Sequence, residues 1–465
     1  MTDLYVVILA AGKGTRMKSG RPKVLHDLAG RPLIDHILSA VGRLDVAETV
    51  IVIGHGADEV RASLSIEHRD VQFVVQSPQL GTGHALLQAE SVLAGRTGTV
   101  LLLYADVPLL EASTLSRLLE AHRAARAAAT VLTAELADPY GYGRILRDEA
   151  GRLLRIVEER DASAADRAIR EVNSGIYALE LAPLFESLHR LAADNAQGEY
   201  YLTDLVAMYR QAGLPLSTLR VNDASELRGV NSRVDLADLA AVLHARKRRD
   251  VMLAGVTLED PASTFIDADV RIGEDTIIAP GVRLTGRTEI GRRCRVHSGT
   301  RISDSTLGDD VRVLDGCVIE QSSVGARVSV GPFAHVRPHS ELADDSRVGN
   351  FVELKKTRLG TRSKANHLAY LGDAVIGDDV NIGAGTIVVN YDGEKKHRTI
   401  IEDGVFVGCD SQLIAPVTIG KGAYVAAGSS ITHDVPPDAL AVARARQTNK
   451  PDWAASRRAR KPGES

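Results

Sequence analysis

The sequence predicts an α/β domain followed by a parallel β-helix. In the first half, short apolar runs alternate with stretches whose apolar residues recur at helical spacing, which is typical of a mainly parallel sheet covered by helices. In the second half, an aliphatic residue recurs every six positions from Ile266 onward, and this is the repeat of parallel β-helices. The chain of 465 residues is also too long for one ordinary core.

We assign residues 1–229 to the α/β domain, 230–250 to a helical connector, and 251–465 to the β-helix domain with its C-terminal tail. The connector has apolar residues at helical spacing, and we interpret the four basic residues at 246–249 as a solvated face or a helix C-terminus. An aromatic content of 4% beside 41 glycines indicates repetitive, aliphatic packing.

The first apolar run, residues 5–8, predicts a buried strand that leads into a glycine-containing loop at residues 9–16. Gly12 and Gly14 allow the backbone to curl with its N–H groups inward, and glycine has no Cβ to keep a ligand away. Positive charge is provided nearby by Lys13, Arg16 and Lys23. We therefore expect this loop to bind the phosphates of a nucleotide.

The loop matches neither of the two commonest phosphate-binding patterns. Met17 stands where the pattern G-x-G-x-x-G needs a glycine, and the Walker spacing G-x-x-x-x-G-K is absent. These mismatches leave a third class as the best interpretation, the nucleotidyltransferases that join a sugar phosphate to a nucleotide.

Three more apolar runs, residues 50–53, 73–75 and 100–104, predict buried strands. Residues 33–44 and 84–93 have helical spacing and predict the amphipathic helices between them. Because ligands of such sheets bind at the carboxyl ends of the strands, we expect the site at that edge.

Asp106 comes directly after the last of these strands and is a candidate magnesium ligand. Magnesium bound to a nucleoside triphosphate needs only one or two protein oxygens, because phosphates and waters complete the octahedron. Asn231 is a candidate second ligand. The alternative is a turn or helix-capping aspartate before Pro108.

The six-residue repeat runs through most of the second half, and one-residue slips restart its phase. Its aliphatic positions are Ile266, Ile272, Ile278, Leu284, Ile290, Val296 and Ile302, then Leu307, Val313 and Ile319, then Val324, Val330, Val336, Leu342, Val348 and Leu354, and finally Ile401, Val407, Leu413, Ile419, Val425 and Ile431. We expect these residues to point inward and to stack on their equivalents in neighbouring coils.

A polar excursion, residues 390–396, breaks this phase between Val388 and Ile401. A loop that leaves a regular solenoid is a common place for function. The tail after about Val435 is rich in proline and arginine, and we expect it to end disordered.

The formal net charge of −4 argues against a nucleic-acid or anionic-membrane partner. We expect no membrane insertion and no signal peptide, because there is no run of about 18 apolar residues and no basic-then-apolar leader. The three cysteines show no metal-ligand spacing. We therefore expect a reduced, cytoplasmic protein.

An ordered set of motifs along nearly the whole chain resembles one family. It includes L-A-A-G-K-G-T-R at 9–16, P-K-V-L at 22–25, Q-L-G-T-G-H at 79–84, D-V-P-L at 106–109, G-Y-G-R at 141–144, N-S-G at 173–175, G-E-Y-Y-L-T-D at 198–204, N-F-V-E at 350–353, S-K at 363–364, His367, N-I-G-A-G-T at 381–386 and N-Y-D-G at 390–393. The chain resembles the bacterial bifunctional N-acetylglucosamine-1-phosphate uridyltransferases / glucosamine-1-phosphate N-acetyltransferases.

The resemblance implies a Rossmann-like nucleotidyltransferase domain and a left-handed β-helix. It implies that acetyl-CoA acetylates glucosamine-1-phosphate, and that the product then reacts with UTP and Mg²⁺ to release pyrophosphate. It also implies a homotrimer with acetyltransferase sites between subunits, and a role in supplying peptidoglycan and lipopolysaccharide precursors.

The resemblance also implies roles for residues of the first domain. Nucleotide contacts fall on Leu9, Ala10, Ala11, Gly12, Lys23, Gln76, Gly81 and Thr82. Sugar-phosphate contacts fall on Tyr104, Ala105, Asp106, Gly143, Glu158, Asn173 and Asn231. Asp106 and Asn231 would hold magnesium, and Arg16 and Lys23 would stabilise charge on the reacting phosphates.

For acetyl transfer the amine must attack as the free base, which calls for a general base. His367 matches the base of the family, and we expect Glu353 to orient it. Sugar-phosphate contacts fall on Arg337, Lys355, Tyr370 and Asn381, and acetyl-CoA contacts fall on Ala384, Asn390, Tyr391, Cys409, Ala427 and Arg444. Lys396 is a weaker candidate for charge at this site.

Three positions depart from the pattern of the family. Ala105 and Asn366 each replace a usual glycine, and Cys409 replaces a usual serine. We expect altered backbone geometry at the first two positions and a weaker hydrogen-bonding group at the third.

Two alternative functions remain open at this point. One is a monofunctional sugar-phosphate nucleotidyltransferase that uses its β-helix only for trimerisation. The other is a non-catalytic regulatory subunit of the same architecture. His367 and the excursion argue against the first alternative, and Lys23 and Asp106 argue against the second.

Overall fold

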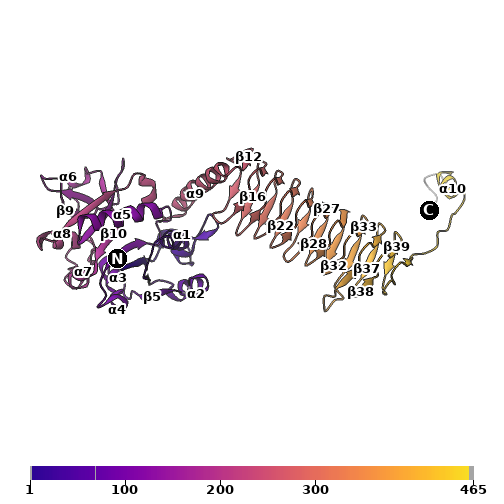
Figure 1. The fold of residues 1–465 in the computed structure, drawn as a ribbon, viewed down its shortest axis with the longest axis horizontal. Coiled ribbons are helices and arrows are strands. Elements are labelled where there is room, and N and C mark those ends of the chain that lie inside the picture. Colours follow the sequence, from indigo (N-terminus) through magenta and orange to yellow (C-terminus); the bar gives the residue numbers. More distant parts are fainter. Residues whose placement is uncertain (1–2, 69, 460–465) are drawn as a thin grey trace. The chain divides into compact units, whose positions relative to one another are not determined.

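The structure is a computed structural model, and it describes residues 3–68 and 70–459. The chain divides into two compact units, Met1–Leu243 and His244–Ser465. The division lies inside the long helix α9 (Arg233–Leu253). Figure 1 shows a sheet with helices in the first unit and a stack of coils in the second.

The first unit contains a mixed sheet in which seven strands follow the order β11-β7-β10-β6-β1-β4-β5. Their bounds are β1 Leu4–Ala10, β4 Glu48–Ile53, β5 Val71–Val75, β6 Thr99–Tyr104, β7 Ala129–Glu135, β10 Glu171–Glu180 and β11 Leu216–Arg220. Strand β1 pairs in parallel with β4 and β6, whereas β10 runs antiparallel to β6 and β7. A short antiparallel pair, β8 (Arg144–Arg147) and β9 (Leu153–Val157), joins β10 off this path.

Helices cover both faces of this sheet. Their bounds are α1 Leu33–Val41, α2 Ala57–Glu67, α3 Thr82–Leu87, α4 Glu90–Leu93, α5 Ala112–Ala125, α6 Ala164–Arg167, α7 Leu181–Leu188 and α8 Asp204–Gln211. Helices α1, α2 and α5 pack into the hydrophobic cluster on one face, and α3, α4, α7 and α8 pack into the cluster on the other. Among the described residues, no helix is long and apolar enough to cross a membrane.

Two predictions for this unit are corrected in detail. The expected helix at residues 84–93 is two short helices, α3 and α4, interrupted at Gln88 and Ala89. The expected buried strand at residues 73–75 belongs to β5, which is the last strand of the sheet and is only partly buried. An edge strand pairs on one side only, which explains its exposure.

A buried histidine in this unit gives stability a pH dependence. His122 on α5 is 1% exposed, and its ring nitrogens contact the Thr130 hydroxyl and the Glu180 carboxylate at 2.9 and 3.0 Å. Burial lowers the pKa of His122, although the hydrogen bond to Glu180 opposes this shift. The unfolded chain therefore binds the proton more readily than the folded one.

We expect the thermal midpoint of the first unit to fall as pH drops below about 6.5, where an unfolded histidine gains its proton. Above that pH this contribution to stability is fully present. Circular dichroism melts of the wild type and of His122→Gln between neutral and mildly acidic pH check this. A variant whose midpoint falls with pH as steeply as that of the wild type would refute the role of His122.

The second unit is a parallel β-helix built from three sheets. The sheets contain strands from β12 (Thr257–Leu258) to β41 (Leu440–Ala441), from β13 (Phe265–Ile266) to β40 (Ser430–Ile431), and from β14 (Arg271–Ile272) to β38 (Val417–Ile419). From β12 to β40, strands that are three apart along the chain pair with one another, so three strands form one coil. At the C-terminal end, β39 pairs with β41. Pairing partners are 18 positions apart at Ile277 and Arg295, and 17 apart at Arg295 and Arg312. The six-residue period is therefore one face of a coil, and its slips are coils one residue shorter.

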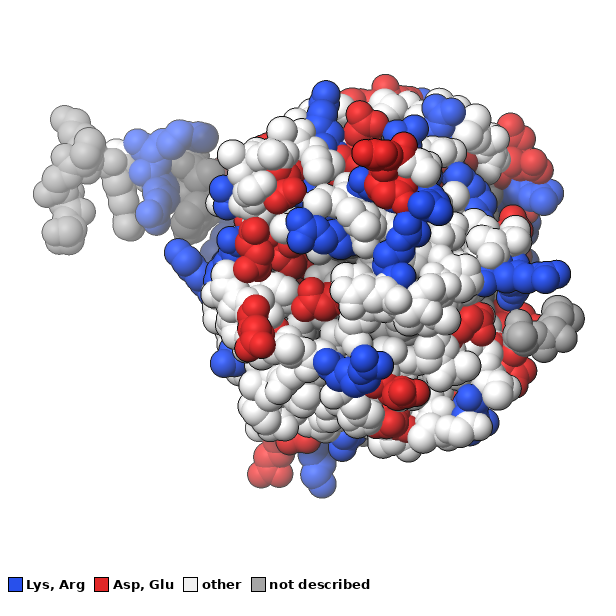
Figure 2. Space-filling view, turned by 90° about the vertical axis from the view of Figure 1, so that its left-hand side faces the viewer, with Lys and Arg blue, Asp and Glu red and all other residues white. Residues whose placement is uncertain are grey.

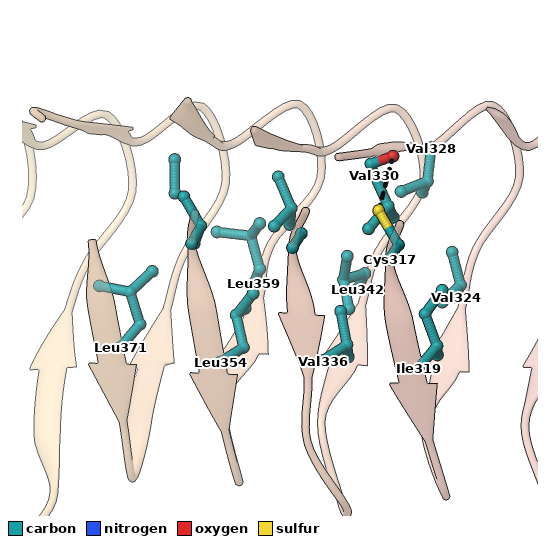
Figure 3. Packing of buried hydrophobic residues seen from close by; sticks show 14 of the residues in the cluster. Cys317, Ile319, Val324, Val328, Val330, Val336, Leu342, Leu354, Leu359 and Leu371 are labelled. Atoms are coloured by element: carbon teal, nitrogen blue, oxygen red, sulfur yellow. Dashed lines mark hydrogen bonds between the residues drawn. The ribbon is translucent and has the colours of Figure 1, made fainter. Parts of the chain in front are cut away.

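The repeating aliphatic residues form the core of this unit. All of the predicted positions are buried except Ile272, which is partly buried near the first coils. Figure 3 shows Ile319, Val336 and Leu354 on successive coils pointing into the interior. Cys317 lies among them and contacts the Val330 carbonyl. Burial raises the pKa of the Cys317 thiol to about 11, so this cysteine behaves as a core residue.

The predicted excursion is confirmed by the strand register. Ala374 on β32 (Ala374–Ile376) pairs with Thr399 on β35 (Thr399–Ile401), 25 positions later. The additional residues form a loop closed by an isolated antiparallel bridge between Tyr391 and Lys396. Asp392 stabilises the loop, because it accepts hydrogen bonds from the backbone N–H groups of Glu394 and Lys395.

One corner of the β-helix carries a ladder of alternating charge. Its members lie one coil apart, and all have left-handed backbone angles: Asp275, Arg293, Asp310, Arg327, Asp345, Arg362 and Asp379. Each arginine donates two hydrogen bonds to the aspartate of the next coil, as Arg327 does to Asp345 with both distances at 2.8 Å. The ion pairs are exposed, so each adds little stability alone.

The expectation that the tail ends disordered concerns residues outside the described part of the chain, but the tail before them contains a helix. Residues Trp453–Ala459 form a short exposed helix, α10. Its alanines and arginines are good helix formers, and the Arg457 guanidinium lies 5.4 Å from the centre of the Trp453 ring. The last residues of the tail, 460–465, lie outside the described residues.

Candidate active sites

The loop after β1 is shaped by one close approach. Gly14 has a left-handed φ of +60°, and a Cβ at this position would lie 2.7 Å from Cβ of Lys23. Glycine is therefore required both by the backbone angle and by the space. Because Gly14 has no Cβ, Lys23 can lie directly against the glycine-containing loop.

A cavity of about 310 Å³ lies beside this loop, at the carboxyl ends of β1 and β6. All eight expected nucleotide contacts line it, together with Tyr104 and Asp106. Sequence reasoning missed Val24, Gln79, Ala85 and Glu199, which also line it. Gln79 lies in the motif Q-L-G-T-G-H at 79–84, but nothing in that motif indicates that its side chain donates a hydrogen bond to the Ala11 carbonyl.

Four side chains meet where the two expected metal ligands lie. The Lys23 ammonium forms an ion pair with Asp106 and donates to Asn231 Oδ1 at 3.0 Å. Arg16 donates to the same amide oxygen, also at 3.0 Å. The carboxylate and the amide oxygen therefore converge on one cation, Lys23.

Asn231 is held in place by the start of α9. Asp235 accepts hydrogen bonds from the backbone N–H groups of Asn231 and Ser232, and Ser232 Oγ accepts one from the backbone N–H of Asp235. Burial acts against ionisation of Asp235, but these hydrogen bonds outweigh it and lower its pKa. The capping arrangement keeps the carboxylate charged and fixes Asn231 beside Lys23.

A second cavity of about 220 Å³ adjoins the first and shares Thr82 and Tyr104 with it. The expected sugar contacts Gly143, Glu158 and Asn173 line it. The Asn173 N–H donates to the Gly143 carbonyl at 2.8 Å, which ties these two residues together. Ala105 is fully buried and packs in the core instead, so its methyl group does not enter either cavity.

Glu158 is the acidic group of the second cavity. Burial raises its pKa, and the charges of Asp204, Asp161 and Glu199 add to this shift. The Thr203 hydroxyl donates to Glu158 at 3.1 Å and opposes the shift. Thr203 lies in the motif G-E-Y-Y-L-T-D at 198–204, which does not by itself indicate a site residue. A carboxyl group in this setting is suited to accept hydrogen bonds from sugar hydroxyls.

In the β-helix, expected sugar-phosphate residues stand on successive coils of one sheet. Arg337 follows β25 (His335–Val336), Lys355 ends β28 (Glu353–Lys355), and Tyr370 begins β31 (Tyr370–Gly372). Arg337 donates to Glu353 Oε1 at 2.7 Å. Asn381 begins β33 (Asn381–Ile382), which belongs to the neighbouring sheet.

Asp373 connects this group to the excursion, and sequence reasoning missed it. It accepts hydrogen bonds from Lys355 Nζ at 2.7 Å and from Asn390 Nδ2 at 2.5 Å. Burial alone would lower the pKa of Lys355, but the hydrogen bond and the charge of Asp373 raise it. Lys396 interacts with Lys355, and this contact lowers the pKa of Lys396. The excursion therefore brings Asn390 and Lys396 to the sugar-phosphate residues.

His367 ends β30 (Lys364–His367) and is exposed. No described hydrogen bond joins Glu353, which was expected to orient it, to His367; Glu353 accepts one from Arg337. The side-chain partner of His367 is Asn350, at the end of β27 (Arg347–Asn350). Asn366 leaves β30 extended and paired with β27, so this departure from the family does not break the strand.

Residues expected at acetyl-CoA form a column on consecutive coils. The Asp410 N–H donates to the Ala384 carbonyl at 2.7 Å, and the Gly428 N–H donates to the Cys409 carbonyl at 2.9 Å. Ala427 is in the coil after Cys409, and Arg444 lies near Gly428. Tyr391 stands apart from this column, on the excursion, where its hydroxyl donates to the Gly393 carbonyl.

Cys409 is a free, exposed thiol in this column, whereas Cys294 and Cys317 are buried. We expect iodoacetamide to inhibit acetyl transfer more than uridyl transfer, because alkylation adds bulk at the expected coenzyme site. Measuring both activities before and after treatment checks this. Unchanged acetyl transfer, or equal sensitivity of Cys409→Ser, would contradict it.

The surface and the residue types also restrict the possible ligands. The face seen in Figure 2 carries interspersed basic and acidic side chains, and neither sign forms a continuous patch on it. In the described part of the chain, no group of three or more His, Cys, Asp or Glu residues could hold a metal ion. A metal at Asp106 would thus depend on oxygens that a substrate supplies.

Three family models match the chain in order. A MobA-like NTP transferase domain matches residues 6–172, a GMPPB C-terminal domain matches 261–391, and six repeats of the bacterial transferase hexapeptide match 398–433. These matches agree with the two folds described above and identify the β-helix as the left-handed hexapeptide type.

Curated relatives match over nearly the full length. The "Bifunctional protein GlmU" of Pelobacter propionicus is 52% identical over 97% of this chain and 98% of its own. The proteins of the same name from Trichlorobacter lovleyi and Shouchella clausii are 52% and 48% identical, over 97% of this chain and 98% and 99% of their own. The chain therefore belongs to the GlmU family of bifunctional enzymes, which combine glucosamine-1-phosphate N-acetyltransferase and N-acetylglucosamine-1-phosphate uridyltransferase activities in the synthesis of UDP-N-acetylglucosamine.

Proposed function

We propose that the two activities reside in two separate sites of this chain, with the residue roles given below. The β-helix site acetylates glucosamine-1-phosphate with acetyl-CoA, and the α/β site transfers UMP from UTP to the product. The convergence of Lys23, Arg16, Asp106 and Asn231 carries the assignment of the α/β site.

In the uridyltransferase site, the cavity beside the glycine-containing loop after β1 holds UTP. The adjoining cavity, with Gly143, Glu158 and Asn173, holds the sugar, so its phosphate faces the α-phosphate of UTP near Asp106. A phosphate oxygen of the sugar attacks the α-phosphorus, and the bond to the β-phosphate breaks. Arg16 and Lys23 stabilise the charge on the leaving pyrophosphate.

Asp106 and Asn231 fit a magnesium ion, because both offer hard oxygen ligands and both already face one cation. When bound, magnesium would neutralise phosphate charge during the transfer. We expect EDTA to stop pyrophosphate release and to leave CoA release from glucosamine-1-phosphate unchanged. Loss of both activities in EDTA would contradict a metal confined to the uridyltransferase site.

In the acetyltransferase site, Arg337 and Lys355 hold the sugar phosphate, with Tyr370 and Asn381 at the sugar. His367 takes a proton from the amine as nitrogen attacks the thioester carbon. The carbon–sulfur bond then breaks, and CoA leaves. The acetyl-CoA residues are Ala384, Asn390, Tyr391, Cys409, Ala427 and Arg444.

We also propose that the enzyme acts as a homotrimer in the cytoplasm. The hexapeptide repeats support self-association. Light scattering should give a mass of about three times 49.8 kDa. A monomeric mass at assay concentration would refute the trimer.

The two-step function is tested with the full chain, glucosamine-1-phosphate, acetyl-CoA, UTP and Mg²⁺. CoA and pyrophosphate are measured separately by chromatography. We expect CoA to appear first and pyrophosphate to follow. Without acetyl-CoA, pyrophosphate should appear only when N-acetylglucosamine-1-phosphate is supplied. Pyrophosphate from that sugar with no CoA release under any condition would favour the monofunctional alternative.

A further inference from the structure

The expected base of acetyl transfer has one side-chain partner among the described hydrogen bonds. Asn350 Oδ1 lies 2.6 Å from Nδ1 of His367. An amide oxygen can only accept a hydrogen bond, so Nδ1 of the ring carries the hydrogen and donates it. In the neutral ring the lone pair is then on Nε2, and Nε2 is the atom that can accept a proton.

The β-helix itself places these two residues together. Asn350 and His367 occupy equivalent positions on neighbouring coils, because β27 and β30 pair in parallel with Asn350 opposite His367. The Asn350 carbonyl also accepts the Leu368 N–H at 3.0 Å, which fixes the backbone just after the histidine. A Cβ on Gly349 would lie 1.8 Å from the Asn366 carbonyl oxygen, so the two strands approach closely at this point.

We propose that Asn350 is the positioning residue for the acetyltransferase base, holding His367 in the tautomer and orientation that direct Nε2 at the amine. This proposal rests on the proposed role of His367 as the base. An amide is well suited to the task, because it fixes the ring without adding charge. A carboxylate in its place would stabilise the protonated ring, so less of the neutral ring that can accept a proton would be present at neutral pH.

The charged side chains of the surrounding strands form no described hydrogen bond with the ring of His367. Glu353 on β28 is held by Arg337 at 2.7 Å, and Lys355 on the same strand is held by Asp373 at 2.7 Å. Strand β30 pairs with β27 and β33, and β33 carries no titratable side chain. The remaining titratable side chains are Arg347 on β27 and Lys364 on β30, with Tyr370 on β31, the next strand along the chain. No described hydrogen bond joins any of them to the ring of His367.

The test compares Asn350→Leu, Asn350→Asp and a control, Asn366→Ala, which removes a neighbouring amide with no described contact to His367. For Asn350→Leu we expect kcat of acetyl transfer to fall about 10- to 100-fold, as for an impaired general base, with KM for both substrates within about twofold. For Asn350→Asp we expect the acidic limb of the pH–rate profile to move up by about one unit or more, because a carboxylate stabilises the imidazolium. Asn366→Ala should show neither change.

Nitrogen-15 NMR of histidine-labelled enzyme provides a readout that does not depend on turnover. The wild type should show Nδ1–H at His367, and Asn350→Leu should show a mixture of tautomers. Wild-type kcat, pH profile and tautomer in both Asn350 variants would overturn the proposal.

His367→Ala separates the role of His367 as base from the positioning role of Asn350. If this variant retains acetyl transfer, the role of His367 as base fails, and the positioning proposal fails with it. If only His367→Ala is inactive, the base role stands and the positioning role alone is wrong.

Discussion

Replacing Asp106 by alanine is expected to reduce pyrophosphate release from UTP and N-acetylglucosamine-1-phosphate by at least about 100-fold, the scale seen when one charge-stabilising group is lost. The carboxylate is the only charged oxygen ligand in the proposed metal pair, and it also holds the Lys23 ammonium. Its loss removes a metal ligand and frees Lys23 to move away from the phosphates. The measurement is the initial rate of pyrophosphate formation at saturating UTP.

The same preparation of Asp106→Ala provides its own control. Release of CoA from glucosamine-1-phosphate and acetyl-CoA should stay at the wild-type rate, because Asp106 and the β-helix residues belong to different units. Asp106→Asn keeps the shape of the side chain and removes its charge, so it tests charge alone. A well-folded Asp106→Ala enzyme that loses both activities, or neither, would contradict the proposed separation of sites.

The opposite selectivity is expected for His367→Ala. Removal of a general base costs about 10² to 10⁴ in rate, so CoA release from glucosamine-1-phosphate should fall by that factor. Pyrophosphate release from preformed N-acetylglucosamine-1-phosphate should be unchanged. The rate is measured by chromatographic detection of free CoA at neutral pH.

His433→Ala is the matched control for this variant, because His433 is an exposed histidine in the same unit that contacts Thr432 instead of the proposed site. It should keep both activities. Equal loss of acetyl transfer in both histidine variants would indicate damage to the β-helix, and full activity of His367→Ala would require another base.

Periodicity predicted the arrangement of elements well, since it reports directly on burial. The run at residues 50–53 became β4, and the six-residue repeat became the core of the β-helix. Periodicity did not distinguish a central strand from an edge strand, so β5 was expected to be more buried than it is. It also did not detect the break between α3 and α4, because Gln88 and Ala89 are ordinary helix formers.

The residues of the candidate sites were also predicted only in part from the sequence. Motif residues such as Gln76 and Thr82 line the first cavity together. Residues that act through a partner were missed, because their spacing depends on the length of a coil. Asn350 lies 17 positions before His367, and Asp373 lies 18 positions after Lys355. Nothing in a linear pattern links such pairs until the coil length is known.

The charge ladder at the corner of the β-helix gives the stack of coils a parity. Aspartate and arginine alternate, so removal of any single coil from this region would place like charges directly above one another, for example Asp310 next to Asp345 if the coil of Arg327 were lost. Removal of two coils would restore the alternation. The aliphatic core is nearly the same in every coil, so the ladder distinguishes odd from even changes in coil number where the core does not.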